Sequence, residues 1–167
     1  LDDTPFTWLV KTFDQDYAAI GNENNIMYVL TNKDAPKYRL IAIDMNNPSP
    51  ENWVDIIPER EEVLESCSHV GGHLIATYLK DAYNEVSVFS LEGTFKYNVE
   101  FPGIGSVNGF GGKSTDNITF YTFTSFNYPT VIFKYNIAEN KSEIYHKYEV
   151  DFNGDDFVTK QVFFESK

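Results

Sequence analysis

The sequence predicts an all-β fold built from repeated four-stranded units. Short alternating runs are filled with aromatic and β-branched residues, which strands prefer, and clusters of Gly, Pro, Asn and Asp separate these runs. The pattern also recurs. Ile43, Phe89 and Tyr135 are spaced 46 residues apart, and each begins a triplet of a large apolar, a small polar and an apolar residue. A period of about 40 to 50 residues with four strands per unit is typical of β-propeller blades.

The clearest hairpin lies in residues 117–137. Ile118–Thr124 alternates as a strand does, and Asn127-Tyr128-Pro129 interrupts the run, since Pro cannot donate to a central ladder. Thr130–Ile137 then forms the returning strand. This hairpin provides the second and third strands of one repeat, and similar pairs precede it in the chain.

Taken in order, the repeats predict three blades, at about 14–58, 63–101 and 104–150. The strands expected in the first are Ala18–Gly21, Ile26–Leu30, Arg39–Met45 and Trp53–Ile57. Those of the second are Cys67–Gly72, Leu74–Leu79, Glu85–Leu91 and Thr94–Phe101. Those of the third are Ser106–Gly112, Ile118–Thr124, Thr130–Ile137 and Ser142–Val150.

The segments outside these repeats predict that the array belongs to a larger ring. Thr7–Phe13 has the pattern of the last strand of an earlier repeat, and Val158–Phe164 that of one further strand. Glu59–Leu64 is expected to connect the first two repeats. Stacked repeats need neighbours to bury their faces, so a pattern that starts in mid-repeat indicates a piece of a longer array.

Composition excludes several function classes. The 167 residues carry a formal net charge of −12, which disfavours nucleic acid and anionic membrane surfaces as partners. No apolar run approaches the ~18–20 residues of a membrane span. The single cysteine, Cys67, excludes an internal disulfide framework and leaves the compartment unknown.

The candidate chemical motifs favour structural roles, and we expect no catalytic, cofactor-binding or metal-binding residue in this chain. The Gly-rich stretch 103–109 does not fit G-x-S-x-G or G-x-G-x-x-G. His69 and His73 are separated by a turn rather than a helix, and His146 is the only other histidine. Cys67 lies in a strand pattern, where an isolated cysteine usually behaves as a small buried hydrophobe. Residues 151–155 begin like a calcium loop, but Asp156 and Val162 stand where Gly and Glu are required.

Several segments together resemble the prolyl oligopeptidase family, in its bacterial more than its animal versions. In chain order they are Ile20–Glu23, Thr31–Pro36, Tyr38–Leu40, Ile43–Asp44, Val70–Gly72, Tyr78–Ala82, Pro102–Val107, Phe123–Phe126 and Asp156–Phe164. Each motif is short, but their shared order covers nearly the whole chain.

The resemblance implies that the chain is the last three or so blades of a seven-bladed propeller. Residues 151–167 would then lead into an α/β-hydrolase domain that carries the Ser, Asp and His triad of a serine peptidase. The propeller would admit only short proline-containing peptides to that domain, and the chain alone would be inactive. Strands nearest the axis would line the channel, and the residues expected there are Cys67, His69, Ser106, Asn108 and Phe110.

Two further expectations follow. A free-standing β-repeat module that binds peptides or glycans is the alternative function. An open arc of three blades exposes two blade faces and free strand edges, so the isolated chain is expected to self-associate, for example as a two-fold pair.

Overall fold

Three antiparallel sheets make up the fold. The computed structural model describes residues 8–148, 156–157 and 159–165, and within them twelve strands form three four-stranded sheets. The first sheet contains β1 (Tyr17–Glu23), β2 (Ile26–Thr31), β3 (Arg39–Asp44) and β4 (Val54–Ile57). The second contains β5 (Val63–Val70), β6 (His73–Lys80), β7 (Tyr83–Phe89) and β8 (Phe95–Asn98). The third contains β9 (Ser106–Gly111), β10 (Ile118–Ser125), β11 (Tyr128–Asn136) and β12 (Lys141–Lys147).

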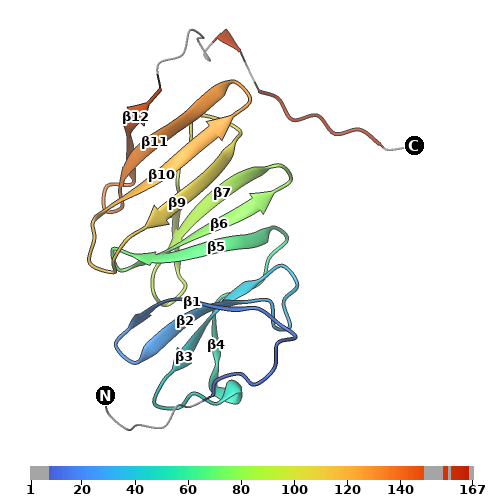
Figure 1. Cartoon of the computed structure of the whole chain (residues 1–167), viewed down its shortest axis with the longest axis vertical. Coiled ribbons are helices and arrows are strands. Elements are labelled where there is room, and N and C mark those ends of the chain that lie inside the picture. The colour runs from blue at the N-terminus through green and yellow to red at the C-terminus, as the bar shows by residue number, and fades with distance from the viewer. Residues whose placement is uncertain (1–7, 149–155, 158, 166–167) are drawn as a thin grey trace.

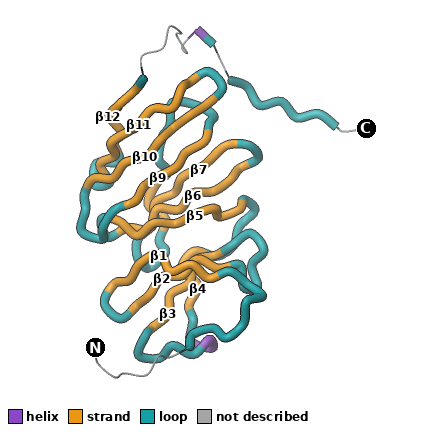
Figure 2. Tube along the Cα trace, in the orientation of Figure 1, coloured by secondary structure: helices purple, strands orange, loops and turns teal. Residues whose placement is uncertain are grey.

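Each sheet is a simple meander in which every strand pairs with the next one in the chain. One 3₁₀ turn, η1 (Pro50–Asn52), lies in the connection between β3 and β4. The all-β prediction and its three four-stranded antiparallel units are confirmed. The sheets stack one upon the next along the long axis of the molecule (Figure 1), and the connections between strands lie at the two rims of the stack (Figure 2).

The first strands of the sheets lie closest together. β1 contacts β5, and β5 contacts β9, whereas the fourth strands β4, β8 and β12 lie at the opposite edge of each sheet. The sheets therefore converge on their first strands, the arrangement that propeller blades have around an axis.

The second sheet is apolar on both faces because it is packed on both sides. In β6, Leu74, Ala76 and Tyr78 belong to a core shared with the first sheet, while Ile75 belongs to a core shared with the third. Side chains alternate across a strand, so this one strand supplies both cores. The near-continuous apolar run of β6 is thus a requirement of its central position.

Aromatic rings dominate the core between the second and third sheets. Tyr121 stacks on Phe110 and Phe133, with ring centroids 4.8 and 5.1 Å apart. Tyr135 is fully buried beside them, and its hydroxyl donates to Asn140 Oδ1 at 2.8 Å. Burial of large rings together with a hydrogen-bonded hydroxyl stabilises the contact between these two sheets.

The two outward faces of the stack differ. On the first sheet, Val29, Ile41 and Ile43 are buried. On the third sheet, Phe120 is 43 % exposed and packs edge-to-face against Tyr145, which is 65 % exposed. The third sheet therefore presents an open aromatic face.

The structure corrects two expected strands. Residues 8–13 and 159–164 form no strand, although Thr7–Phe13 and Val158–Phe164 have the alternating composition for one. Composition alone does not make a strand, because its backbone groups need a partner ladder. In addition, β5 begins at Val63, four residues before the expected Cys67, so the connection expected at Glu59–Leu64 ends earlier. Thr7, Val158 and residues 149–155, with the calcium-like motif, lie outside the described residues.

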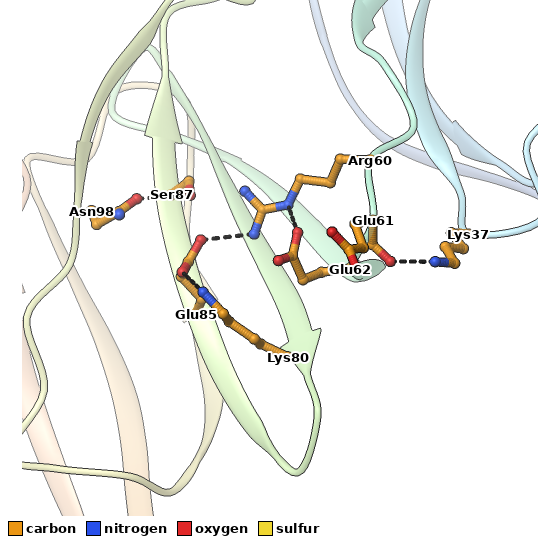
Figure 3. A network of polar contacts seen from close by, with 8 residues as sticks. All are labelled: Lys37, Arg60, Glu61, Glu62, Lys80, Glu85, Ser87 and Asn98. Atoms are coloured by element: carbon orange, nitrogen blue, oxygen red, sulfur yellow. Dashed lines mark hydrogen bonds and ion pairs between the residues drawn. The ribbon is translucent and has the colours of Figure 1, made fainter.

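Electrostatic contacts fix the connection between the first and second sheets (Figure 3). Arg60 lies in this connection, 2.7 Å from Glu85 on β7 and 2.9 Å from Glu62, and its guanidinium stands 3.4 Å over the ring of Tyr78. Such a stacked cation is attracted by the ring as well as by the carboxylates. On the other side, Lys37, in the connection between β2 and β3 of the first sheet, donates through Nζ to the backbone carbonyl of Glu61. One short segment is thereby bound to both sheets.

The same network shifts the ionisation of its members. Burial opposes the charge on Glu85, but the hydrogen bond and charge of Arg60, aided by Lys80, hold the pKa of Glu85 below its ordinary value. Burial raises the pKa of the Tyr78 hydroxyl to about 12, against the opposing effect of Arg60. Glu85 therefore contributes stability as an anion.

The turn between β5 and β6 packs directly on the third sheet. Gly71 and Gly72 have φ of +59° and +68°, a region that favours glycine. A Cβ on Gly71 would lie 2.5 Å from the carbonyl oxygen of Asp116 and 2.8 Å from Ile137 Cδ1, whereas a Cβ on Gly72 would meet nothing within 4 Å. An alanine would therefore strain the backbone at either position, but only at Gly71 would its methyl group also clash with the third sheet.

We expect Gly72→Ala to cost about 1 kcal/mol through backbone strain alone. Gly71→Ala should cost ~2–4 kcal/mol, because the added methyl also pushes the third sheet away. Urea unfolding of the two variants provides the comparison. Equal losses would contradict the close packing of this turn on the third sheet.

We expect Glu85→Gln to cost about 1–2 kcal/mol at neutral pH, because it removes a partly buried charge pair. The folded-state pKa is depressed, so this contribution is fully present above the ordinary value of 4.5 and is lost as the pH falls through the folded pKa. The variant should therefore lose less stability on acidification than the parent, measured by urea unfolding at several pH values. Glu143→Gln, in an exposed pair with Lys141, is the control. A parallel acid dependence for parent and Glu85→Gln would contradict the assignment.

Candidate functional site

The first strands of the sheets form the candidate site, since the sheets converge there. On β9, Ser106 and Asn108 are exposed, while Val107 between them is buried against the second sheet. The backbone carbonyl oxygen of Asn108 accepts a hydrogen bond from Thr122 Oγ1 at 3.2 Å, so its side-chain amide is not used in this contact. Ser106 and Asn108 thus leave their polar side chains on the open side of β9.

Phe110 lies on the other side of β9 because of a β-bulge. Alternation from Ser106 and Asn108 would keep Phe110 on their face, but the pairing of β9 with β10 shifts between Tyr121, opposite Gly109, and Phe120, opposite Gly111. Phe110 has φ of +61°, and its ring is 1 % exposed in the aromatic core. A bulge re-aims a side chain in this way. Phe110 therefore packs between sheets.

The side chains of Cys67 and His69 on β5 are also buried, in the interface between the second sheet and the first. Cys67 is buried in the core shared by the first two sheets, and burial raises the pKa of its thiol to about 12. The His69 ring lies edge-on to Tyr28 at 5.5 Å, and a Cβ on Gly21 would come within 2.9 Å of its Nδ1. Neither side chain is on an open surface.

The histidines have separate surroundings. His69 Nε2 is buried without a hydrogen-bond partner, and burial lowers the pKa of its imidazole despite the opposing charge of Glu23. His73 Nδ1 lies 2.7 Å from the carbonyl oxygen of Gly71, and His146 packs edge-on to Tyr148. Among the described residues, no three His, Cys, Asp or Glu side chains are grouped to hold a metal ion.

A pocket lies at the rim next to Ser106, between the second and third sheets. Its volume is about 280 Å³. It is lined by Ala82, Ile104, Gly105, Ser106, Thr124, Ser125 and Phe126. Phe126, in the turn between β10 and β11, is 99 % exposed. The sequence predicted a break at Asn127-Tyr128-Pro129, but the turn is Phe126–Asn127, and Tyr128 and Pro129 belong to β11. No sequence pattern indicated that this turn would border a pocket with Ser106.

In the part of the chain that the structure describes, there is no helix with the length and apolar character needed to cross a bilayer.

Comparisons with known proteins agree with this architecture. The family model described as the prolyl oligopeptidase N-terminal β-propeller domain matches residues 2–148. The prolyl endopeptidase of Elizabethkingia meningoseptica is 37 % identical over 163 residues, and that of Dictyostelium discoideum is 29 % identical over 169 residues. These alignments cover 98 % and 95 % of this chain but only 23 % and 22 % of the relatives, so the chain spans less than a quarter of their length.

Solved structures give the same result. A structure from a mechanistic study of two prolyl endopeptidases aligns with a TM-score of 0.83 at 36 % identity, covering 88 % of this chain and 22 % of that one. Prolyl oligopeptidase B from Galerina marginata, without bound substrate, aligns with a TM-score of 0.86 at 26 % identity, covering 95 % and 23 %. With three four-stranded sheets that converge on their first strands and a family match over most of its length, the chain belongs to the prolyl oligopeptidase family and corresponds to part of its N-terminal β-propeller domain.

Proposed function

We propose that this chain is the substrate-gating part of a prolyl oligopeptidase. In this proposal an α/β-hydrolase domain of the same polypeptide cleaves short peptides after proline by a serine mechanism, and residues 151–167 lead into that domain. The propeller keeps larger substrates away from the nucleophile, and the chain has no peptidase activity by itself. The observation that carries the proposal is the match of the whole chain to less than a quarter of each prolyl endopeptidase relative.

The placement of the candidate residues supports a steric role. Ser106 and Asn108 leave polar side chains on the open side of β9 and are the ones we assign to the channel wall. Cys67, His69 and Phe110 pack behind the same inner strands and hold them in position. A wall of this kind selects by size, because short flexible peptides pass where a folded chain does not.

The chemistry of the buried groups supports an inactive chain. A nucleophilic cysteine needs its thiolate, and the raised pKa of Cys67 keeps it protonated at neutral pH. The His69 imidazole is buried against Gly21 and Tyr28, away from the exposed Ser106 side chain. Neither Cys67 nor Ser106 therefore has the activated state that a nucleophile in acyl transfer requires.

The test of the proposed activity is a chromogenic Gly-Pro substrate given to this chain and to the full-length gene product. We expect cleavage by the full-length protein only. Cleavage by neither would overturn the proposal in favour of a β-repeat module that binds peptides or glycans. Cleavage by the chain alone would also overturn it, and Ser106→Ala would then identify the nucleophile. Circular dichroism of the chain confirms that an inactive sample is folded.

A second expected property of the isolated chain is self-association. The third sheet leaves Phe120 and Tyr145 exposed on its outward face. Among the described residues β12 pairs with β11 alone, so its outer edge is open and its side chains are largely exposed. Such edges and apolar faces pair with other chains. We expect a dimer by light scattering at micromolar concentration, and Tyr145→Lys should shift it to the monomer. Met45→Lys, in the turn that follows β3 of the first sheet, is the control and should leave the dimer intact. A monodisperse monomer of the parent chain would contradict this expectation.

A further inference from the structure

The chain returns to the third sheet after leaving it. Asn127, in the turn between β10 and β11, donates from Nδ2 to the carbonyl oxygen of Phe157 at 2.8 Å. Its Oδ1 accepts a hydrogen bond from Thr159 Oγ1 at 2.6 Å. Figure 1 shows the C-terminal segment passing beside this turn before it runs away from the stack. One side chain therefore holds the segment at two points.

The amide of Asn127 is itself fixed in orientation. Ser125 Oγ donates to the same Oδ1 at 2.8 Å, which directs the Nδ2 group toward Phe157. An amide is required here because the site needs both a donor and acceptors on one short side chain. Asp would lose the donor, and Ala would lose both.

An apolar surface lies around this clamp. Phe126, next to Asn127, is 99 % exposed at the mouth of the rim pocket, whose lining residues are all uncharged. Beyond the clamp, where Figure 1 shows the segment running away from the stack, it carries three consecutive exposed apolar side chains, Val162 at 73 %, Phe163 at 75 % and Phe164 at 87 %. Exposed aromatic residues beside a pocket are typical of an interface.

We propose that the turn Ser125–Asn127 is the docking point for the domain that follows this chain in the full-length protein. Asn127 clamps the connecting segment at Phe157 and Thr159, and apolar side chains of that domain cover Phe126 and its pocket. The proposal rests on the proposed function, since it takes the α/β-hydrolase domain as the occupant.

The covalent link favours this occupant over a second copy of the chain. The clamp holds Thr159 beside the turn, so chain that follows is tethered there through a short connection and is present at a high effective concentration. The uncharged lining of the pocket matches an apolar partner and gives a strongly charged one no counter-ion. In this arrangement Asn127 is a positioning residue that fixes where the connecting segment leaves the third sheet.

Tryptic cleavage after Lys160 tests the clamp on the isolated chain, since Lys160 is exposed and directly follows Thr159. We expect Asn127→Ala to raise the cleavage rate about tenfold or more, because it removes both hydrogen bonds that hold the segment at Phe157 and Thr159. Asn127→Asp, which keeps the acceptor, should give an intermediate rate. Asn22→Ala, at the exposed end of β1 in the first sheet, is the matched control and should leave the rate unchanged. An unchanged rate in Asn127→Ala would overturn the clamp.

The same cleavage, measured on the full-length protein, tests the docking. We expect Phe126→Ser to raise it several-fold there and to have no effect in the isolated chain, where Phe126 is already exposed. Met45→Ser, on a turn at the opposite rim, should have no effect in either. An unchanged rate for Phe126→Ser in the full-length protein would overturn the docking.

This readout is independent of peptidase activity. A full-length protein that fails to cleave the Gly-Pro substrate but responds to Phe126→Ser as expected would refute the proposed function and leave the docking point supported.

Discussion

Face-to-face packing of consecutive sheets is the interaction on which this structure depends. A four-stranded meander has two faces, and only the second sheet has both covered by its neighbours, which is why β6 is apolar on both sides. The third sheet keeps one covered face, where the rings of Phe110, Tyr121 and Phe133 stack, and one open aromatic face. No sheet buries enough on its own, so each owes its stability to the next.

Directional contacts add precision to this non-directional packing. Apolar burial brings the sheets together but sets their relative angle only loosely, whereas Arg60 and Lys37 fix the connection between the first two sheets, and the Gly71 turn fixes the second against the third. For a gate that works by size, the angle between blades sets the width of the opening. The contacts of Arg60 and Lys37 and the proposed channel wall therefore depend on the same angle between the sheets.

Much of the fold could be predicted from the sequence, and less of the site. The 46-residue spacing of Ile43, Phe89 and Tyr135 identified the repeats, because each repeat places the same strand chemistry at the same position. Alternation failed at Phe110, where a bulge with positive φ reverses the face of the side chain. It also failed at both ends of the chain, where strand-like composition has no partner ladder. The Asn127 clamp joins residues 30 and 32 positions apart, and no local pattern indicates such a contact.

The meander topology also determines how the chain acquires its structure. Every strand pairs with its neighbour in sequence, so the hydrogen bonds of one sheet close within a single repeat. Loop-closure entropy is small for such local pairings, and they form early. During synthesis each sheet can take shape as it leaves the ribosome, with its predecessor already present as a template for its inner face. Of these three sheets the third is the last to be synthesised, and within the described residues no later sheet covers its face carrying Phe120 and Tyr145, so this face is the one of the three that aggregation and chaperones can reach most readily.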